Sequence, residues 1–257
     1  MKQQIAPVTA AGEVMPGSYI IWLSSPEIAG EARPGQFVMV RCGDDTILRR
    51  PLSIHRRDGD KLALLFTVVG KGTDWLARRQ PGDTIDLFGP LGNGFEVNPA
   101  STNLLLVAGG IGMAPLYFLA NEAAEQKKQI TLLLGAQTKS RLYPAYLLPP
   151  GITVVNSTED GTAGHKGMVN ELLPRYAAEA DQICACGPAA MYHDMATKYR
   201  QSLKDKPVQV SLEMRMGCGL GICYGCTIRT KRGLQQVCQH GPVFELGDIV
   251  WDELFAI

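Results

Sequence analysis

Three cysteines lie within ten residues in the segment Gly217-Cys218-Gly219-Leu220-Gly221-Ile222-Cys223-Tyr224-Gly225-Cys226, and a fourth follows at Cys238. Four residues separate the first two cysteines, two separate the next pair, and eleven precede the last. This C-x4-C-x2-C…C order is typical of loops that hold a [2Fe-2S] cluster. The intervening glycines suit that role, because such a loop needs positive φ angles and backbone N–H groups close to sulfur. The spacing therefore predicts Cys218, Cys223, Cys226 and Cys238 as cluster ligands.

A structural zinc site is the alternative for the same cysteines, because zinc also binds four thiolates. Zinc ribbons usually place their ligands as paired C-x2-C knuckles, which this chain lacks, so the spacing favours the cluster. His240 lies two residues after Cys238 and could act as a ligand as in a Rieske centre, but four cysteines are already present. The remaining cysteines, Cys42, Cys184 and Cys186, are expected to be free buried thiols.

The composition is that of an ordinary globular protein without an excess of either charge. Its 257 residues are enough for two compact domains and a small appendage. The 25 basic and 25 acidic residues cancel, so no nucleic-acid or anionic-membrane surface is expected. Residues 1–7 carry no apolar signal segment, and no apolar run reaches the ~20 residues that cross a bilayer. We therefore expect a cytoplasmic protein.

Residues 1–99 predict an antiparallel β-barrel. Short strands alternate with glycine and proline turns, a pattern typical of closed or nearly closed barrels. The expected strands are residues 18–24, 36–41, 52–55, 61–69 and 84–88. The turn signals are Pro34-Gly35, Pro81-Gly82 and Gly89-Pro90-Leu91-Gly92.

Two motifs in this barrel have the chemistry to bind a phosphate-containing cofactor. In Arg49-Arg50-Pro51-Leu52-Ser53-Ile54, the proline fixes the backbone as a strand begins and holds Arg50 and Ser53 in a defined relation. The arginine offers a planar fork for a diphosphate, and the serine hydroxyl can meet a polar ring edge. In Gly70-Lys71-Gly72-Thr73, glycines open a short helix with Thr73 as its expected N-cap, and such an N-terminus presents free N–H groups to an anion.

Residues 100–210 show strands that alternate with helices. The continuous apolar run at 104–108 is typical of a parallel strand buried on both faces. Gly109-Gly110-Ile111-Gly112 follows it and precedes a helix, which is a phosphate-binding arrangement, although the spacing is not the usual dinucleotide fingerprint. Further strands are expected at 130–134, 152–156 and 182–186, and helices at 114–126, 168–176 and 189–202. The pattern predicts a doubly wound parallel sheet with ligand-binding loops at 109–112, 158–161 and 186–188.

These motifs together resemble the ferredoxin-NADP reductase superfamily. The resemblance is carried by Arg-Pro-x-Ser at 50–53, Gly-x-Gly-Thr at 70–73, Gly-Pro-Leu-Gly at 89–92 and Cys-Gly-Pro at 186–188. It implies that Arg50 binds the FAD diphosphate, that Ser53 lies near the reactive flavin edge, and that Gly72 and Thr73 cap the diphosphate. Other cofactor contacts are expected at Pro51, Leu52, Thr67, Gly109, Gly110, Gly112, Cys186, Gly187 and Pro188, with Cys186 near the nicotinamide. No catalytic side chain is expected, because hydride passes directly between nicotinamide and flavin.

The C-terminal segment 211–257 is predicted as a small [2Fe-2S] module. Residues 211–226, with the Cys-x-x-Gly-Pro-Val-Phe continuation at 238–244, closely resemble the electron-transfer subunits of class B dihydroorotate dehydrogenases. The resemblance implies electron flow from an FMN-containing (β/α)8 catalytic subunit through the cluster and FAD to NAD+, in pyrimidine (UMP) biosynthesis. It also implies a heterotetramer with two subunits of each kind.

Two other functions stay open at this point. The same modules occur in reductase subunits that serve a hydrogenase, a sulfite reductase or a transhydrogenase. A non-catalytic interaction module with a structural zinc site is the more remote alternative. Lys139 and Arg141 could meet the 2′-phosphate of NADP, but the family resemblance favours NAD. His55, His165 and His193 are expected to be solvated or packing residues.

Overall fold

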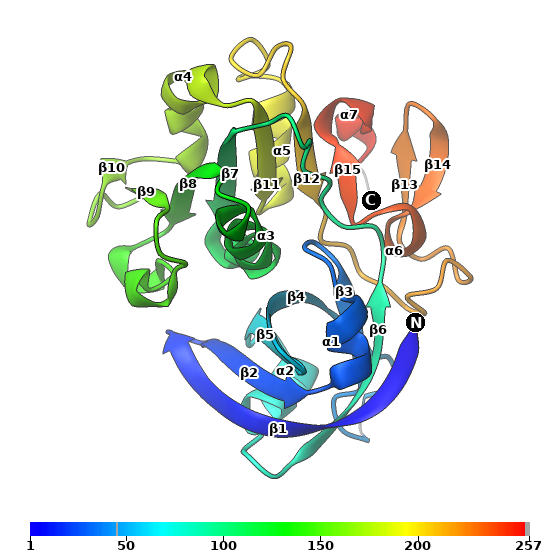
Figure 1. Cartoon of the computed structure of the whole chain (residues 1–257). Helices are drawn as coiled ribbons and strands as arrows, with labels where there is room; N and C mark the ends of the chain where they lie inside the picture. Colours follow the sequence, from blue (N-terminus) through cyan, green and yellow to red (C-terminus); the bar gives the residue numbers. More distant parts are fainter. Residues whose placement is uncertain (45, 255–257) are drawn as a thin grey trace.

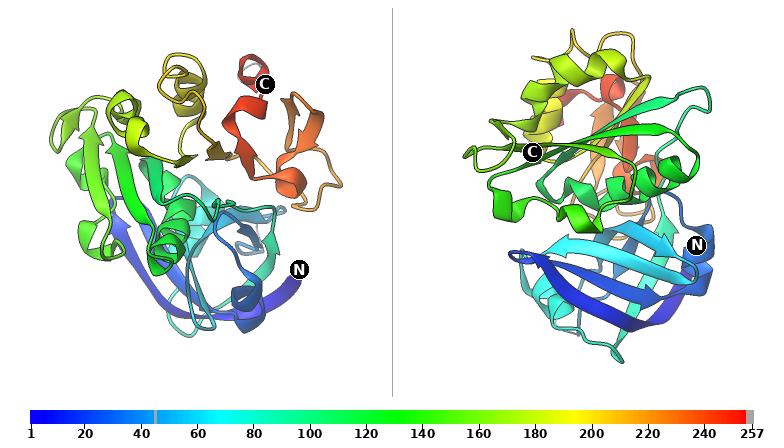
Figure 2. Two further views of the ribbon diagram at one scale, coloured as in Figure 1. Left: turned by 45° about the horizontal axis from the view of Figure 1, so that its top comes forward. Right: turned by 60° about the vertical axis from the view of Figure 1, so that its left-hand side comes forward.

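The computed structural model describes residues 1–44 and 46–254. A closed β-barrel forms the lower part of the molecule in Figure 1, a sheet flanked by helices lies above it, and the C-terminal segment lies beside that sheet. The right-hand view of Figure 2 shows barrel and sheet as two stacked bodies. This architecture confirms the predicted antiparallel barrel, parallel-sheet domain and small C-terminal module.

The barrel has six strands in the order β1-β2-β5-β4-β3-β6, and β1 pairs with β6 to close it. All six neighbouring pairs are antiparallel. Large apolar residues such as Leu62, Leu64 and Phe66 fill the interior and are at most 3% exposed. The strands are β1 (Lys2–Met15), β2 (Ser18–Ser24), β3 (Phe37–Val40), β4 (Arg50–Asp58), β5 (Lys61–Thr67) and β6 (Thr84–Leu91). Two short helices, α1 (Pro26–Glu31) and α2 (Lys71–Ala77), connect them.

Strand β1 is an element that the sequence pattern does not predict. It is 14 residues long, but only Ala6, Val8 and Met15 are buried. Hydrophobic periodicity cannot separate such a solvent-facing strand from a loop. Its strand conformation depends instead on the hydrogen-bonded ladders with β2 and β6.

The second domain is a seven-stranded sheet in the order β10-β9-β8-β7-β11-β12-β15. Every neighbouring pair is parallel except β12 with β15, which is antiparallel. The strands are β7 (Asn103–Gly109), β8 (Gln129–Ala136), β9 (Thr153–Thr158), β10 (His165–Lys166), β11 (Gln182–Cys186), β12 (Val208–Ser211) and β15 (Val243–Glu245).

Helices cover both faces of this sheet, as a doubly wound topology requires. Leu104, Leu106 and Ala108 of β7 pack in one core cluster with α3 (Met113–Glu125). The alternate residues Leu105 and Val107 belong to the cluster that contains α4 (Leu173–Tyr176) and α5 (Ala189–Ala196).

Two helices are shorter than the sequence pattern predicts. The segment expected as one helix at 168–176 is a 3-10 turn, Val169–Leu172, followed by the single turn of α4. Pro174 has no N–H group for an α-helical bond, which limits the helix at this point. The helix expected at 189–202 ends at Ala196, where the Thr197 hydroxyl donates to His193 O at 2.7 Å. Such a side-chain bond competes with continuation of the helix.

The barrel and the sheet domain meet where β4 packs against α3. His55 of β4 is 1% exposed, with Nδ1 2.9 Å from Ala114 O and Nε2 3.0 Å from the Tyr143 hydroxyl. The carbonyl can only accept, so Nδ1 carries the proton and Nε2 accepts from Tyr143. Burial lowers the pKa of His55 to about 4. His55 is therefore a satisfied, neutral packing residue, one of the two roles expected from sequence.

The C-terminal module is tied to both larger domains. It contains the hairpin β13 (Thr227–Thr230) and β14 (Gly233–Gln236), followed by α6 (Val237–His240) and, after β15, by α7 (Trp251–Leu254). Strand β15 extends the large sheet, and Pro242 forms a β-bridge with Asn93 after the last barrel strand. The domain boundaries expected after residues 99 and 210 stay predictions. No helix among the described residues is long and apolar enough to cross a membrane.

Candidate functional site

A cavity of about 660 Å³, which we call the barrel cavity, lies between the barrel and the sheet domain. Its barrel wall contains the start of β4, and its other wall contains Ile111, Ala114 and residues 211–216. Six of the predicted FAD contacts line it: Arg50, Pro51, Leu52, Ser53, Thr67 and Thr73. The structure thus brings the two barrel motifs together in one cavity, and their roles in binding stay predictions.

The Arg50 side chain lies directly against Gly72. A Cβ atom added at Gly72 would come within 2.9 Å of Arg50 Nε, so the glycine leaves room for the guanidinium. Arg50 donates one hydrogen bond to Leu48 O. Its other donors give the cavity a planar, positively charged fork, which matches the geometry of a diphosphate. The seventh predicted FAD contact, Gly72, therefore supports the cavity from behind Arg50.

Thr73 is not the N-cap of α2, contrary to the sequence-based expectation. Gly70 occupies that position, and Thr73 is the third helical residue. The Thr73 hydroxyl accepts from Val69 N at 2.9 Å and Gly70 N at 3.2 Å, and donates to Gly70 O at 3.1 Å. This threonine fixes the loop before α2 because its hydroxyl reaches back toward the preceding N–H groups.

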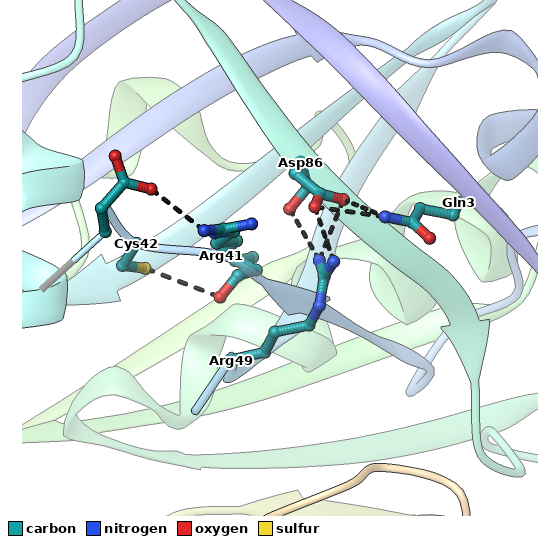
Figure 3. A network of polar contacts seen from close by, with 7 residues as sticks. Gln3, Arg41, Cys42, Arg49 and Asp86 are labelled. Atoms are coloured by element: carbon teal, nitrogen blue, oxygen red, sulfur yellow. Dashed lines mark hydrogen bonds and ion pairs between the residues drawn. The ribbon is translucent and has the colours of Figure 1, made fainter. Parts of the chain in front are cut away.

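The neighbouring arginines Arg49 and Arg50 have different partners. Figure 3 shows Arg49 in a bidentate pair with Asp86, with Nη1 3.0 Å from Oδ1 and Nη2 2.6 Å from Oδ2. Gln3 donates to the same carboxylate at 3.1 Å, so the pair links the residue before β4 to β6 and β1. Arg49 is therefore held by Asp86, and of these two arginines Arg50 keeps free donors for a ligand.

A second cavity of about 430 Å³, which we call the sheet cavity, lies at the C-terminal ends of the parallel strands. Gly109 and Gly110 after β7, Gly135 of β8, and Pro188 after β11 line it. Ligands of doubly wound sheets bind at this end. The cavity lies at the loops for which the sequence predicts ligand binding, and the binding itself stays a prediction.

Gly112 holds the glycine turn against the turn after β11. A Cβ atom at Gly112 would lie 1.9 Å from Cys186 O, and one at Gly109 would lie 2.9 Å from Pro188 Cδ. Only glycine permits this approach of the two backbones at residue 112. The turns at 109–112 and 186–188 are therefore one packed unit.

Cys186 is 1% exposed, and its thiol lies 3.6 Å from Ser211 O. Burial raises the pKa of this thiol well above its usual range. Tyr192, which sequence reasoning did not single out, accepts from Gly187 N at 2.8 Å and donates to Ser211 O at 2.6 Å. The fully buried tyrosine thus ties the Cys186-Gly187-Pro188 turn to the end of β12. Only the tertiary contact reveals this role.

Asn170 is a second residue that the sequence did not mark. It lines the sheet cavity, is 2% exposed, and donates from Nδ2 to Met191 O at 2.9 Å. Its Oδ1 is buried, and no partner for it lies within the described part of the chain. Buried acceptors are normally hydrogen-bonded. Asn170 thus holds an unsatisfied acceptor oxygen beside the sheet cavity.

The charges around the sheet cavity are mixed. Arg141 lines it together with Glu159 and Asp194, whereas Lys139 is not among the lining residues. An additional phosphate is usually bound by concentrated positive charge. One arginine between two carboxylates offers little of it, which favours NAD over NADP.

The two cavities adjoin each other. Thr67, Val69 and Ile111 line both of them. A ligand in one cavity can therefore meet a ligand in the other at this boundary, which direct hydride transfer requires.

Three of the four predicted cluster ligands lie in one irregular loop, and the fourth, Cys238, lies in α6 after the β13–β14 hairpin. Gly219 and Gly221 have φ values of 74° and 76°, and Tyr224 has 58°. These turns aim N–H groups at sulfur, with Leu220 N 3.3 Å from Cys218 Sγ and Gly221 N 3.1 Å from Cys238 Sγ. Such N–H bonds stabilise thiolates and tune a bound cluster.

The thiols are grouped in two pairs, Cys218 with Cys223 and Cys226 with Cys238. Desolvation opposes ionisation of Cys218, but N–H donors led by Leu220 outweigh it and lower its pKa to about 6. Desolvation and the neighbouring Cys226 raise the pKa of Cys238 to about 12. Across residues 1–44 and 46–254, no three His, Cys, Asp or Glu side chains gather around one point as ligands of a single ion do. Two pairs match a cluster with two irons, each of which takes two thiolates.

The cysteine loop continues directly from a wall of the barrel cavity. Met214, Arg215 and Met216 line the cavity, and Cys218 follows two residues later. A Cβ atom at Gly219 would lie 2.8 Å from Met39 Cγ, so the loop also packs on β3 of the barrel. The chain thus places the cysteines beside the barrel cavity.

Two family models match this chain. Residues 213–250 match the iron-sulfur cluster binding domain of dihydroorotate dehydrogenase B, and residues 106–197 match the oxidoreductase NAD-binding domain. These matches confirm the predicted [2Fe-2S] and nucleotide modules.

Related proteins resemble the chain over nearly its whole length. The dihydroorotate dehydrogenase B (NAD(+)) electron transfer subunit of Desulforamulus reducens is 42% identical, over 96% of this chain and 98% of the relative. That of Bacillus caldolyticus is 39% identical, over 91% and 93%. A chain of an NADH-dependent reduced ferredoxin-NADP oxidoreductase has a TM-score of 0.88 and 32% identity, over 98% of this chain and 92% of that chain. This chain belongs to the family of dihydroorotate dehydrogenase B (NAD(+)) electron transfer subunits.

Proposed function

We propose that this chain carries electrons from a dihydroorotate-oxidising catalytic subunit through a [2Fe-2S] cluster and FAD to NAD+, in pyrimidine biosynthesis. One observation supports the whole sequence of transfers. The cysteine loop adjoins the barrel cavity, and the barrel cavity shares Thr67, Val69 and Ile111 with the sheet cavity. Three redox groups in these places would lie in the order in which electrons must pass.

FAD is the cofactor that fits the barrel cavity. When bound, it exchanges electrons singly with a cluster and in pairs with a nicotinamide. Arg50 would hold the diphosphate through its free donors, with Gly72 leaving space behind it and Thr73 fixing the adjoining loop. Pro51, Leu52, Ser53 and Thr67 would contact the rest of the cofactor from the cavity wall.

NAD+ fits the sheet cavity. Gly109, Gly110 and Gly112 would let the dinucleotide backbone approach the turn after β7, and Asn170 Oδ1 would accept from one of its hydroxyl or amino groups. Cys186, Gly187 and Pro188 form the turn that would flank the nicotinamide, with Tyr192 holding it in position. These residues bind and orient, and none supplies a proton to the hydride step.

A partner surface is proposed around the cysteine loop. Ile222, Tyr224 and Leu234 are 71%, 66% and 64% exposed, and Cys223 is exposed among them. Contiguous exposed apolar surface marks protein interfaces, and these side chains would contribute to one around the loop. We assign this surface to an FMN-containing catalytic subunit, in a heterotetramer with two of each chain, in the cytoplasm where thiols stay reduced.

A second candidate is a transhydrogenase-type partner. The 32% identical chain with a TM-score of 0.88 comes from an NADH-dependent reduced ferredoxin-NADP oxidoreductase. Such a protein would share the FAD, NAD and cluster sites, so the partner alone distinguishes the two functions.

The test is anaerobic spectroscopy of the purified chain, with assays of iron and acid-labile sulfide. We expect flavin bands with an iron-sulfur shoulder, bleached by NADH. Addition of the FMN subunit and dihydroorotate should then reduce NAD+, whereas reduced ferredoxin with NADP+ should not support turnover. A colourless zinc protein would contradict the proposal.

A further inference from the structure

Met168 is an exposed apolar residue on the wall of the sheet cavity. Its side chain is 55% exposed, and the residue stands between β10 and the 3-10 turn Val169–Leu172. Met168 lines the cavity together with its neighbours Gly167, Val169 and Asn170. Single exposed apolar side chains are common on protein surfaces. This one differs, because it lies on a cavity of ligand size and has no role in the sites described above.

The side chain of Glu171 holds the backbone around Met168. Met168 N donates to Glu171 Oε1 at 3.3 Å, and Glu171 N donates to Met168 O at 3.0 Å. His165 Nε2 lies 2.9 Å from Glu171 Oε2. The hydrogen bonds from His165 and from Met168 N lower the pKa of Glu171, which keeps the carboxylate charged. One charged side chain thus ties the two ends of the segment 165–171 together.

Gly167 anchors the other side of Met168 to β9. Gly167 N donates to Thr158 O at 3.0 Å, and Gly167 O accepts from Ser157 Oγ at 2.6 Å. Gly167 has a φ of 139°, and a Cβ atom there would lie 2.6 Å from Glu171 Oε2, so the position requires glycine. The backbone of Met168 is therefore fixed while its side chain stays exposed. Such a side chain is preorganised for contact with a ligand.

The position of Met168 indicates which part of a dinucleotide it would meet. NAD+ carries a nicotinamide ring and an adenine ring. The nicotinamide must reach the flavin, so it belongs at the boundary marked by Thr67, Val69 and Ile111, which line both cavities. Met168 lines the sheet cavity alone. A methionine thioether packs favourably against aromatic rings, and the ring left for this one is adenine.

We propose that the adenine ring of NAD(H) packs on the Met168 side chain, with His165 and Glu171 as positioning residues, an inference that rests on the proposed function. Met168 touches the nucleotide, whereas His165 and Glu171 act through the backbone that carries it. The contact contributes to affinity. It does not change the rate of hydride transfer at saturation, because the adenine takes no part in the reaction.

The first test compares NADH with reduced nicotinamide mononucleotide, which carries the nicotinamide without the adenine. Stopped-flow reduction of the flavin in the holoprotein gives a dissociation constant and a saturated rate for each donor. We expect M168S to raise the dissociation constant of NADH about threefold to tenfold and to leave that of the mononucleotide and both saturated rates unchanged. M168L keeps an apolar side chain and should restore most of the affinity. I5S is the matched control, because Ile5 is 63% exposed and lies outside both cavities.

The second test concerns the positioning residues. E171A removes the carboxylate that holds Met168 N and His165, so we expect NADH to bind about twofold to fivefold more weakly, with no change for the mononucleotide. In M168S, the added E171A change should have less than about a twofold effect, because residues that act through one contact are not additive. H165Q keeps an N–H donor for Glu171 and should bind NADH as the wild type does.

The outcomes separate this inference from the proposed function. An unchanged NADH affinity in M168S, or equal losses with NADH and the mononucleotide, would overturn the adenine contact. Full additivity of E171A and M168S would overturn the positioning role. If the mononucleotide reduces the flavin too slowly to compare, ADP, which carries adenine without nicotinamide, is used as a competitor of NADH, and an inhibition constant that M168S leaves unchanged would overturn the contact. A wild-type holoprotein whose flavin is not reduced by NADH would overturn the proposed function instead.

Discussion

The barrel cavity and the cysteine loop hold their functional groups in opposite ways. Arg50 and Ser53 belong to β4, which is paired with β3 over residues 50–53 and with β5 over residues 54–58. The cysteine loop has no regular structure between β12 and β13 and follows its path through positive-φ residues such as Gly219 and Gly221. The cavity therefore has its shape without a ligand, whereas the loop gains cross-links only from a bound cluster.

This contrast predicts different consequences of mutation. Loss of a binding group from a strand should weaken a ligand and leave the fold intact, because neighbouring strands hold the backbone. Loss of a cysteine should remove the cluster entirely, because each iron needs both of its thiolates. Mutations of residues that link barrel strands to one another, or the barrel to the sheet domain, should lower stability more than they weaken binding.

The largest expected effect is that of Cys226→Ser. Cys226 is 2% exposed and belongs to the buried thiol pair with Cys238. Its loss leaves one iron with a single thiolate, so we expect iron and acid-labile sulfide to be lost and transfer to the partner to fall at least about a hundredfold. Cys184→Ala, at a buried cysteine of β11, is the matched control and should keep its iron and acid-labile sulfide. A Cys226 variant with full cluster content would contradict the ligand assignment.

Acid should destabilise the contact between barrel and sheet domain through His55. Its pKa is about 4 in the folded chain, below the usual 6.5, so the unfolded chain binds more protons between these values. Stability is complete above pH 6.5 and falls as the pH drops toward 4, by roughly 3 kcal/mol for this residue. Urea unfolding of the wild type and of His55→Gln across this range should isolate the effect. Equal pH slopes in both proteins would contradict it.

How far the sequence predicts this molecule depends on where its signals lie. Four strands of the large sheet, β7, β8, β9 and β11, are predicted, most clearly β7, where Leu104 to Ala108 are apolar and buried on both faces. The short strands β10, β12 and β15 are not predicted from the sequence. Strand β1 lacks that signal, since most of it faces solvent and tertiary pairing alone defines it. The N-cap at Thr73 was misassigned, because the hydroxyl reaches back to Gly70 N from one turn inside the helix.

In the candidate site, too, sequence motifs predict some features and tertiary contacts alone define others. Motif spacing brings together the cysteines and the barrel residues around Arg50. It cannot show that Arg49 is paired with Asp86, because those residues are 37 positions apart. Asn170 carries no sequence signal either, since only the folded chain shows that it lines the sheet cavity with one oxygen unpaired. Pairwise contacts between distant residues are the information that single-sequence patterns lack.

The neighbouring arginines Arg49 and Arg50 provide a sharper comparison. Arg50→Met should weaken FAD binding by about tenfold to a hundredfold, the loss expected when charged hydrogen bonds to a diphosphate are removed. Arg49→Met leaves the Asp86 carboxylate, 14% exposed, without its cation, so we expect a loss of about 2 kcal/mol in unfolding free energy. Fluorescence titration of FAD and urea unfolding of the apoproteins measure the two effects. If Arg49→Met weakened FAD binding and Arg50→Met lowered the unfolding free energy, the two roles would have to be exchanged.

The smallest expected effect is a loss of NADH affinity on mutation of Asn170, a binding residue of the sheet cavity. Asn170→Ala removes the unpaired Oδ1 together with the Nδ2 bond to Met191 O, so NADH should bind about five- to tenfold more weakly, equivalent to roughly 1 kcal/mol. Asn121→Ala on the surface of α3 is the matched control and should have no effect. Stopped-flow reduction of the flavin at varied NADH measures the dissociation constant separately from the rate at saturation. A change in the saturated rate with unchanged affinity would mean that Asn170 positions the nicotinamide and does not anchor the dinucleotide.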